Sequence, residues 1–183
     1  MATERFGLGP DSHVVEVASN DGYLLQYFVE RGVPVLGVEP AANVARVARE
    51  RGVRTIVKFF GRSTAREIAA MVRADLLIAN NVLAHVPDLN DFVSGLKLVL
   101  GPEGVLTLEF PQLANMVADN EFDTIYHEHF SYFSVLTAQR VLERHGLKLF
   151  DIDELPTHGG SVRLYVCHQE DTTKTESGSV ERV

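Results

Sequence analysis

The strongest constraint on the fold is the alternation of short apolar runs with amphipathic helical patterns along the first 110 residues. Five runs have the length and the Val, Ile and Leu content of buried strands, and helical patterns separate most of them. These runs are residues 13–18, 33–39, 55–60, 74–80 and 104–110. Because such alternation is typical of βαβ crossovers, the sequence predicts a parallel sheet with helices on both faces.

The pattern changes after the fifth run, where a long connection leads to one more helical pattern and a closing pair of strands. These parts are residues 111–134, 137–146, and the pair 147–155 and 161–168. We therefore expect an α/β fold of Rossmann-like type, with a mostly parallel seven-stranded sheet. One domain over residues 1–169 accounts for all of these elements. The tail, residues 170–183, lacks apolar periodicity and is expected to be disordered.

Composition narrows the class of protein. Hydrophobic residues make up 45% and charged residues 23%, which is ordinary for a globular domain, and no apolar run approaches the ~20 residues of a membrane span. The net charge of −8 argues against nucleic-acid binding, which depends on clustered Lys and Arg. A single cysteine, Cys167, excludes an internal disulfide and a zinc site built from several cysteines. The N-terminus lacks the apolar region of a secretory signal, so we expect a cytoplasmic protein.

Ligands of such sheets bind beyond the carboxyl ends of the strands. The stretch EVASNDG, residues 16–22, follows the first strand but lacks the spaced glycines that let a pyrophosphate approach a helix N-terminus. Ala18, Asn20 and Tyr23 occupy the three glycine positions of that pattern. Asp21 adds a negative charge, which disfavours phosphates and favours a cation. The sequence therefore predicts a positively charged ligand at this edge.

Glu39 ends the second strand, at a position from which a carboxylate can accept hydrogen bonds from both hydroxyls of a ribose. A ribose without a pyrophosphate, beside several carboxylates, suits S-adenosylmethionine, whose sulfonium and amine are both positive. A phenylalanine pair follows the third strand and can pack on adenine, and an asparagine pair follows the fourth. The predicted residues for binding S-adenosylmethionine or S-adenosylhomocysteine are Glu16, Ala18, Ser19, Asn20, Gly22, Glu39, Pro40, Phe59, Phe60, Asn80 and Asn81.

Six stretches, in order, carry a family resemblance. They are EVASNDGYLL, GVEP, NNVLAHVPDLNDF, EFP, YHEHFSYFS and THGGSVR. Residues 12–168 resemble the catalytic core of sugar C-methyltransferases that act on nucleotide-linked deoxysugars, and YHEHFSYFS, residues 126–134, is the most specific stretch. The resemblance implies a class I methyltransferase fold, S-adenosylmethionine as cofactor, and methylation of carbon 3 of a TDP-linked 4-keto hexose. Family members also carry an N-terminal zinc domain and a further C-terminal domain, so the chain resembles an isolated central domain.

Methylation of a carbon beside a ketone requires a base that removes a proton and forms an enolate. The resemblance implies His129 as this base, with Tyr126 and Glu128 as supporting polar groups near the sugar. If the stretch were helical, Tyr126, His129 and Tyr132 would share one face and Glu128 would turn toward Tyr132. A tyrosine hydroxyl could donate to the enolate oxygen, while Glu128 could orient a substrate hydroxyl or stabilise the imidazolium. The sequence does not separate these roles.

Several alternatives accompany this hypothesis. His127 is expected to face away, His85 to pack against a helix, and His158 to lie in a tight turn. The H-E-H run lacks the i, i+4 histidines of H-E-x-x-H, so no metal site is predicted. The aromatic stretch could instead be core, the chain could bind the cofactor without turnover, or it could methylate oxygen or nitrogen of a small molecule. The predicted partner is a small-molecule sugar nucleotide, with no nucleic acid or membrane; the oligomeric state is not predicted.

Overall fold

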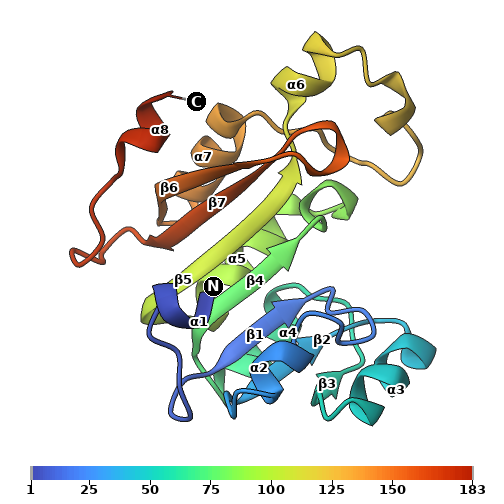
Figure 1. Cartoon of the computed structure of the whole chain (residues 1–183), viewed down its shortest axis with the longest axis vertical. Helices are drawn as coiled ribbons and strands as arrows, with labels where there is room; N and C mark the ends of the chain where they lie inside the picture. Colours follow the sequence, from blue (N-terminus) through green and yellow to red (C-terminus); the bar gives the residue numbers. More distant parts are fainter. Residues whose placement is uncertain (1, 183) are drawn as a thin grey trace.

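The computed structural model describes residues 2–182, which fold around one seven-stranded sheet (Figure 1). The strands are β1 (Val14–Val17), β2 (Val35–Val38), β3 (Thr55–Ile56), β4 (Ala74–Asn80), β5 (Leu100–Pro111), β6 (Leu147–Leu155) and β7 (Ser161–His168). Their order in the sheet is β3-β2-β1-β4-β5-β7-β6. The strands from β1 to β5 pair in parallel, whereas β7 runs antiparallel to both β5 and β6. The predicted mostly parallel seven-stranded sheet is confirmed.

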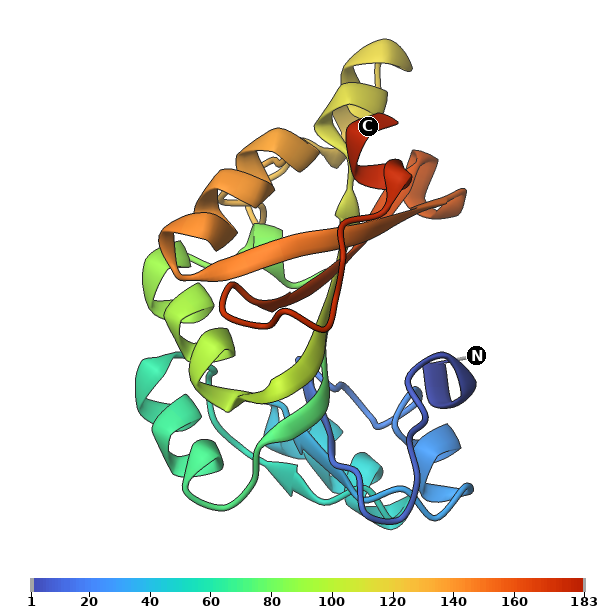
Figure 2. The same ribbon diagram turned by 90° about the vertical axis from the view of Figure 1, so that its left-hand side faces the viewer.

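Helices cover both faces of the sheet (Figure 2). One face carries α4 (Arg62–Ala69), α5 (Leu89–Val99) and α7 (Val135–Arg144), and the other carries α1 (Ala2–Arg5), α2 (Gln26–Val29) and α3 (Ala42–Glu50). Successive side chains of a strand point to opposite faces, so β4 contributes side chains to two apolar clusters. Leu77 and Ala79 join the cluster under α5, and Leu76 and Ile78 join the one under α2. Within residues 2–182, no helix is long and apolar enough to cross a bilayer.

Two elements are shorter than their sequence patterns. The apolar run 55–60 pairs in the sheet only over Thr55–Ile56, and the helical pattern 22–32 forms a regular α-helix only in α2. After Ile56 the chain leaves the sheet, and Phe60 packs its ring against Phe92 of α5 with centroids 5.3 Å apart. The contact of Phe60 with α5 thus takes the place of a longer pairing in the sheet.

The connection after β5 rises above the carboxyl edge of the sheet and contains α6 (Leu113–Ala118) and the short 3₁₀ turn η2 (Phe122–Thr124) (Figure 1). Residues 119–134 of this connection are called the aromatic segment below. Its end is fixed in two ways. The N–H of Leu113 donates to the carbonyl of Phe133 at 2.9 Å, and Ser134 caps α7 through a reciprocal capping box with Thr137.

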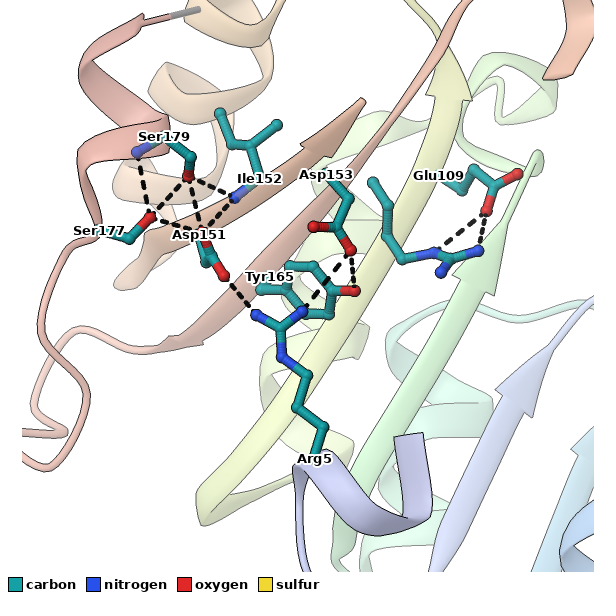
Figure 3. A network of polar contacts seen from close by, with 9 residues as sticks. Arg5, Glu109, Asp151, Ile152, Asp153, Tyr165, Ser177 and Ser179 are labelled. Carbon is teal, nitrogen blue, oxygen red and sulfur yellow. Dashed lines mark hydrogen bonds and ion pairs between the residues drawn. The ribbon is translucent and has the colours of Figure 1, made fainter. Parts of the chain in front are cut away.

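Residues 170–182, which the sequence predicts to be a disordered tail, make contacts with the sheet in the described structure. The chain runs back along the sheet to α8 (Gly178–Arg182), which packs against β6 (Figure 2). Asp171 is 6% exposed, and the hydroxyls of Ser177 and Ser179 donate to the carboxylate of Asp151 (Figure 3). Val180 packs against the main apolar cluster. Polar side chains fix this segment, and apolar periodicity carries no signal for such contacts.

Candidate functional site

At the carboxyl edge of the sheet, the topological switch point lies between β1 and β4. The strand order reverses there, so the loops after these two strands diverge, and ligands of open α/β sheets bind at such points. Glu16 lies on β1, Asn80 ends β4 and Glu39 follows β2. The sheet therefore gathers predicted residues from separate parts of the sequence at one edge.

The loop after β1 has an unusual backbone. Ala18, Asn20 and Gly22 have positive φ angles of 56°, 49° and 77°. Left-handed conformations of residues other than glycine cost of order 1 to 3 kcal/mol and cluster at ligand sites. Two features favour glycine at position 22. One is its positive φ angle, and the other is the lack of space, because an added Cβ would lie 3.0 Å from the side chain of Val53. The N–H of Asn20 donates to Oε2 of Glu39 at 3.2 Å, so the loop is tied to the end of β2.

The carboxylate of Glu39 can accept further hydrogen bonds from a ligand. It is 7% exposed, and its Oε1 accepts from the N–H of Ala41 at 2.8 Å while Oε2 accepts from Asn20. A carboxylate offers about four lone-pair sites, so each oxygen can still accept one hydroxyl hydrogen. Pro40 lies between Glu39 and Ala41 in the chain. This geometry fits the paired hydroxyls of a ribose.

Three buried polar atoms at this edge have no hydrogen-bond partner within residues 2–182. They are Oε2 of Glu16, Oγ of Ser19 and Oδ1 of Asn80. Leaving such a group unpaired costs about 1 to 3 kcal/mol, so nearly all buried polar groups in proteins are paired. Oδ1 of Asn80 can only accept, and so can Oε2 of Glu16 when its carboxylate is ionised. A ligand with an amine or another positively charged end supplies the missing donors.

The electrostatics of the edge favour a cation. Burial raises the pKa of Glu16 to about 8, so in the ligand-free protein this carboxyl is largely protonated at neutral pH. Burial also raises the pKa of Tyr23, and the charges of Glu16, Glu109 and Asp21 raise it further. Acidic groups are therefore gathered in a poorly solvated place, and a positively charged ligand would favour the ionised form of Glu16.

The two predicted adenine contacts differ in environment. Phe60 is already packed against Phe92, whereas the ring of Phe59 is 84% exposed and available to a ligand. Asn81 has a φ of 51°, and its N–H donates to the carbonyl of Glu109 at 2.7 Å. Asn81 therefore turns the chain after β4, and Asn80 is the residue that presents an unpaired amide oxygen.

The aromatic segment is not a helix after η2, so the helical arrangement considered from the sequence is wrong. A turn nevertheless brings the same side chains together, because the N–H of His129 donates to the carbonyl of Tyr126 at 3.1 Å. The ring centroids of Tyr126 and His129 lie 4.3 Å apart, and those of His129 and Tyr132 lie 5.6 Å apart. Glu128 and His127 expose their side chains.

The tautomer of His129 follows from its partner. Nδ1 lies 2.9 Å from the carbonyl oxygen of Thr124, and a carbonyl can only accept, so Nδ1 carries the proton. In the neutral ring Nε2 then has a free lone pair. The cavity bordered by His129 and Tyr132 holds about 10 Å³, which is too small for a sugar. An acceptor would therefore approach His129 from its solvent side.

His85 belongs to this cluster, which the sequence analysis missed. It ends the 3₁₀ turn η1 (Leu83–His85) after β4, and its ring meets that of His129 edge-on at 4.8 Å. Its Nδ1 donates to the carbonyl of Glu128 at 3.1 Å. The sequence predicts that His85 packs against a helix, and the structure shows these contacts with the aromatic segment in addition. One feature of the sequence could have indicated this role: His85 follows shortly after the asparagine pair at the end of the fourth strand.

An ion pair borders the same edge and was also missed. Arg163 of β7 donates through Nη2 and Nε to Oε2 of Glu109 on β5, at 2.7 and 3.2 Å. Glu109 is 7% exposed and faces Arg163 in the strand register (Figure 3). His158 and Gly159 lie in η3 (Thr157–Gly159), the turn between β6 and β7, where the sequence places His158 in a tight turn; their φ angles are 51° and 75°.

A family model described as "Methyltransferase domain" matches residues 2–152. The chain belongs to this methyltransferase family. The match confirms the S-adenosylmethionine-dependent methyltransferase domain and the Rossmann-like fold predicted from the sequence. The geometry of the edge agrees, since its unpaired acceptors and its carboxylates fit that cofactor.

Relatives and solved structures of this methyltransferase domain agree with the family. C-methyltransferase NovU from Streptomyces niveus is 40% identical over 166 residues, which cover 90% of this chain and 40% of NovU. A ubiquinone biosynthesis O-methyltransferase from Bradyrhizobium sp. (strain ORS 278) is 28% identical over 98 residues, 52% of this chain and 38% of that protein. The chain thus spans about two fifths of the length of these curated relatives.

Two solved structures show the same fold. The N1-methyltransferase of 1,6-didemethyltoxoflavin from Burkholderia thailandensis superposes with a TM-score of 0.67 at 16% identity, over 92% of this chain and 75% of that one. The magnesium protoporphyrin IX methyltransferase from Synechocystis PCC 6803 gives a TM-score of 0.65 at 15% identity, over 85% and 73% of the two chains.

Proposed function

We propose that this domain transfers the methyl group of S-adenosylmethionine to a carbon of a nucleotide-linked 4-keto deoxysugar, by way of an enolate. The observation that carries the proposal is a histidine with a free Nε2, above a strand edge whose buried acceptors lack donors. Similarity to NovU, named as a C-methyltransferase, supports a carbon acceptor.

The cofactor would be held by the carboxyl ends of three strands. Glu39 would accept the two ribose hydroxyls, and Phe59 would cover the adenine. Glu16 and Asn80 would receive the positively charged amine through their unpaired oxygens. When bound, the cofactor supplies an electrophilic methyl group on a sulfonium.

The base would be His129. Nε2 would take the proton from the carbon beside the ketone, which leaves an enolate with its electron pair available at that carbon. The bond from Nδ1 to the carbonyl of Thr124 holds the ring in the required tautomer and stabilises the imidazolium that forms. The Tyr126 ring lies against His129, from where its hydroxyl could donate to the enolate oxygen.

Isotope exchange tests the reaction class. A TDP-linked 4-keto deoxysugar incubated with the domain and S-adenosylhomocysteine in D₂O should gain deuterium at carbon 3, observed by proton NMR. His129→Ala should abolish the exchange. Methylated product without any exchange at carbon 3 would contradict the enolate.

A second candidate is methylation of an oxygen, which the similarity to ubiquinone biosynthesis O-methyltransferases over half of the chain favours. An oxygen acceptor already has a lone pair, so the product would carry its new methyl on oxygen and carbon 3 would keep its hydrogen. A third is a cofactor-binding module without turnover, in which calorimetry detects cofactor binding while neither exchange nor product appears.

A further inference from the structure

A groove of about 410 Å³ lies on the face of the sheet that α4, α5 and α7 cover (Figure 2). It is called the basic groove here. Its volume is within the range of about 300 to 1,000 Å³ that is usual for small-molecule sites. None of its lining residues belongs to the strand edge proposed for the methyl donor. Its charged and titratable lining residues are Arg62, Arg66, Arg73, Lys97, His145 and His168.

The lining is positively charged, although the chain has a net charge of −8. Within residues 2–182 it contains four cationic side chains and no carboxylate. The charge of Lys97 is balanced, because its Nζ lies 3.1 Å from Oε1 of Glu170. Arg73 donates to the carbonyl of Leu98, which is a neutral partner. The charges of the three arginines are therefore not neutralised by the fold.

Arg62 and Arg66 are placed at a cost to α4. Their guanidiniums have no hydrogen-bond or ion-pair partner within the described part of the chain. Asp91 of α5 accepts from the backbone N–H of Arg62 at 3.1 Å and not from its guanidinium. Like charges at i and i+4 destabilise a helix, and a cation in the first turn is disfavoured by the helix dipole. An anion between the two guanidiniums would remove both costs.

His145, which follows α7, responds to the charge of the groove. Its Nε2 donates to Oδ1 of Asn90 at 3.0 Å, and its Nδ1 accepts from Oγ of Ser94 at 3.1 Å. The ring is thus fixed in the wall of the groove. Burial lowers the pKa of His145, and the charge of Arg62 lowers it further. A bound anion would oppose the effect of Arg62.

We propose that the basic groove binds a small anion with two or more phosphoryl groups. Arg62 and Arg66, one turn apart on α4, would hold one phosphoryl group, and Arg73 would contact the next. A guanidinium has five N–H donors in a planar fork that matches the oxygens of a phosphate. The inference goes beyond the proposed function and does not rest on it, because the groove and the strand edge share no residue.

The test uses inorganic pyrophosphate as probe and the 183-residue chain, with affinity measured by calorimetry. Arg66→Gln is the key variant, because its side chain is exposed and its loss breaks no contact of the fold. We expect about tenfold weaker binding, as for one lost hydrogen bond between charged groups. Arg46→Gln on α3 is the matched control, since it removes the same charge from an exposed pair with Glu50. At physiological ionic strength, where charges beyond about 8 Å are screened, its affinity should stay within about twofold of the parent.

The ring of His145 gives a second readout, by NMR titration of its ring protons with and without pyrophosphate. Its pKa should rise when pyrophosphate binds, because the anion stabilises the imidazolium. Arg62, Arg66 and Lys97 are the charged groups that line the groove with it, and His168 is the other titratable one. Ring signals that do not respond to pyrophosphate would place the anion elsewhere and reject the groove.

Three further outcomes would overturn the proposal. Pyrophosphate could fail to bind at millimolar concentration, or the losses in Arg66→Gln and Arg46→Gln could be equal, which indicates diffuse attraction by charge. An oligoglutamate peptide that binds more tightly than pyrophosphate, and loses affinity in Arg66→Gln, would identify a protein-docking surface instead. S-Adenosylhomocysteine should bind Arg66→Gln as it binds the parent. Its failure to bind the parent would contradict the proposed function and leave the groove as inferred.

Discussion

The strand edge that would hold the cofactor and the aromatic segment that would hold the acceptor are built differently. Glu16 and Glu39 at the edge are 2% and 7% exposed, and the Glu39 carboxylate accepts hydrogen bonds from two backbone N–H groups. In the aromatic segment Phe122, Ile125 and Phe130 are 80%, 67% and 62% exposed. The donor side is thus enclosed by the domain itself, and the acceptor side is an apolar surface open to solvent.

The difference has a physical origin. A parallel sheet buries both faces, so side chains at its strand ends are positioned by packing on two sides. The aromatic segment has only its own turns and a few anchors, such as the bond from Phe130 N–H to the carbonyl of Ala84 at 2.8 Å. We infer that the strand edge, where the cofactor would bind, is rigid. The aromatic segment, where the acceptor would bind, is less restrained. Four measurements test this difference between the strand edge and the aromatic segment.

The largest effect is expected at the base. His129→Ala should slow methyl transfer by ~10² to 10⁴, the usual contribution of a general base. His127→Ala is the matched control, since that ring is exposed two residues away, and its rate should stay within about twofold of the parent. Single-turnover product formation with a TDP-linked 4-keto sugar measures both. An equal loss in the two variants would assign the effect to the fold of the segment and not to a base.

The second prediction compares how much one side chain in each region contributes to the free energy of unfolding. Leu77→Ala removes a fully buried side chain of β4 and should lower the free energy of unfolding by about 2 to 5 kcal/mol. Phe122→Ala removes a larger side chain, but one that is 80% exposed, and should change it by less than about 0.5 kcal/mol. Urea denaturation gives both values. A loss above about 1.5 kcal/mol at Phe122, roughly half of what truncating a buried phenylalanine costs, would show that the aromatic segment is packed in solution.

Glu39→Ala should weaken cofactor binding by about 1.5 to 3 kcal/mol, as expected for hydrogen bonds to a charged acceptor. Glu50→Ala is the control, because that carboxylate pairs with Arg46 on the exposed face of α3. Calorimetry with S-adenosylhomocysteine compares them. Equal affinities in Glu39→Ala and the parent would remove Glu39 from the site.

The last measurement concerns a dependence on pH, of about the same size as the effect of Glu39→Ala. Burial raises the pKa of Glu16 from 4.5 to about 8, so the folded ligand-free protein binds this proton more tightly than the unfolded chain. Glu16 therefore lowers folding stability progressively as pH rises from about 4.5 to about 8. A bound cation favours the ionised carboxylate, so S-adenosylmethionine should bind up to about tenfold more tightly per pH unit between pH 6 and 8, with proton release.

The control is Glu16→Gln, which should make the affinity for S-adenosylmethionine independent of pH over this range. Tyr23, Asp21 and Glu109 are the charged or titratable groups coupled to the same edge. Calorimetry in two buffers of different ionisation enthalpy counts the protons released. A parent protein that releases none would place the cation away from Glu16.

The sequence by itself determined the sheet, the order of its parallel strands along the chain, and the acidic residues at the strand ends. These follow from local patterns, because apolar alternation and strand-end position depend on neighbours in sequence. The tertiary structure decided the rest. The contact of His85 with His129, the pair of Glu109 and Arg163, and the packing of residues 170–182 join parts of the chain far apart in sequence. No local period encodes such contacts, since their partners meet only after the sheet has formed.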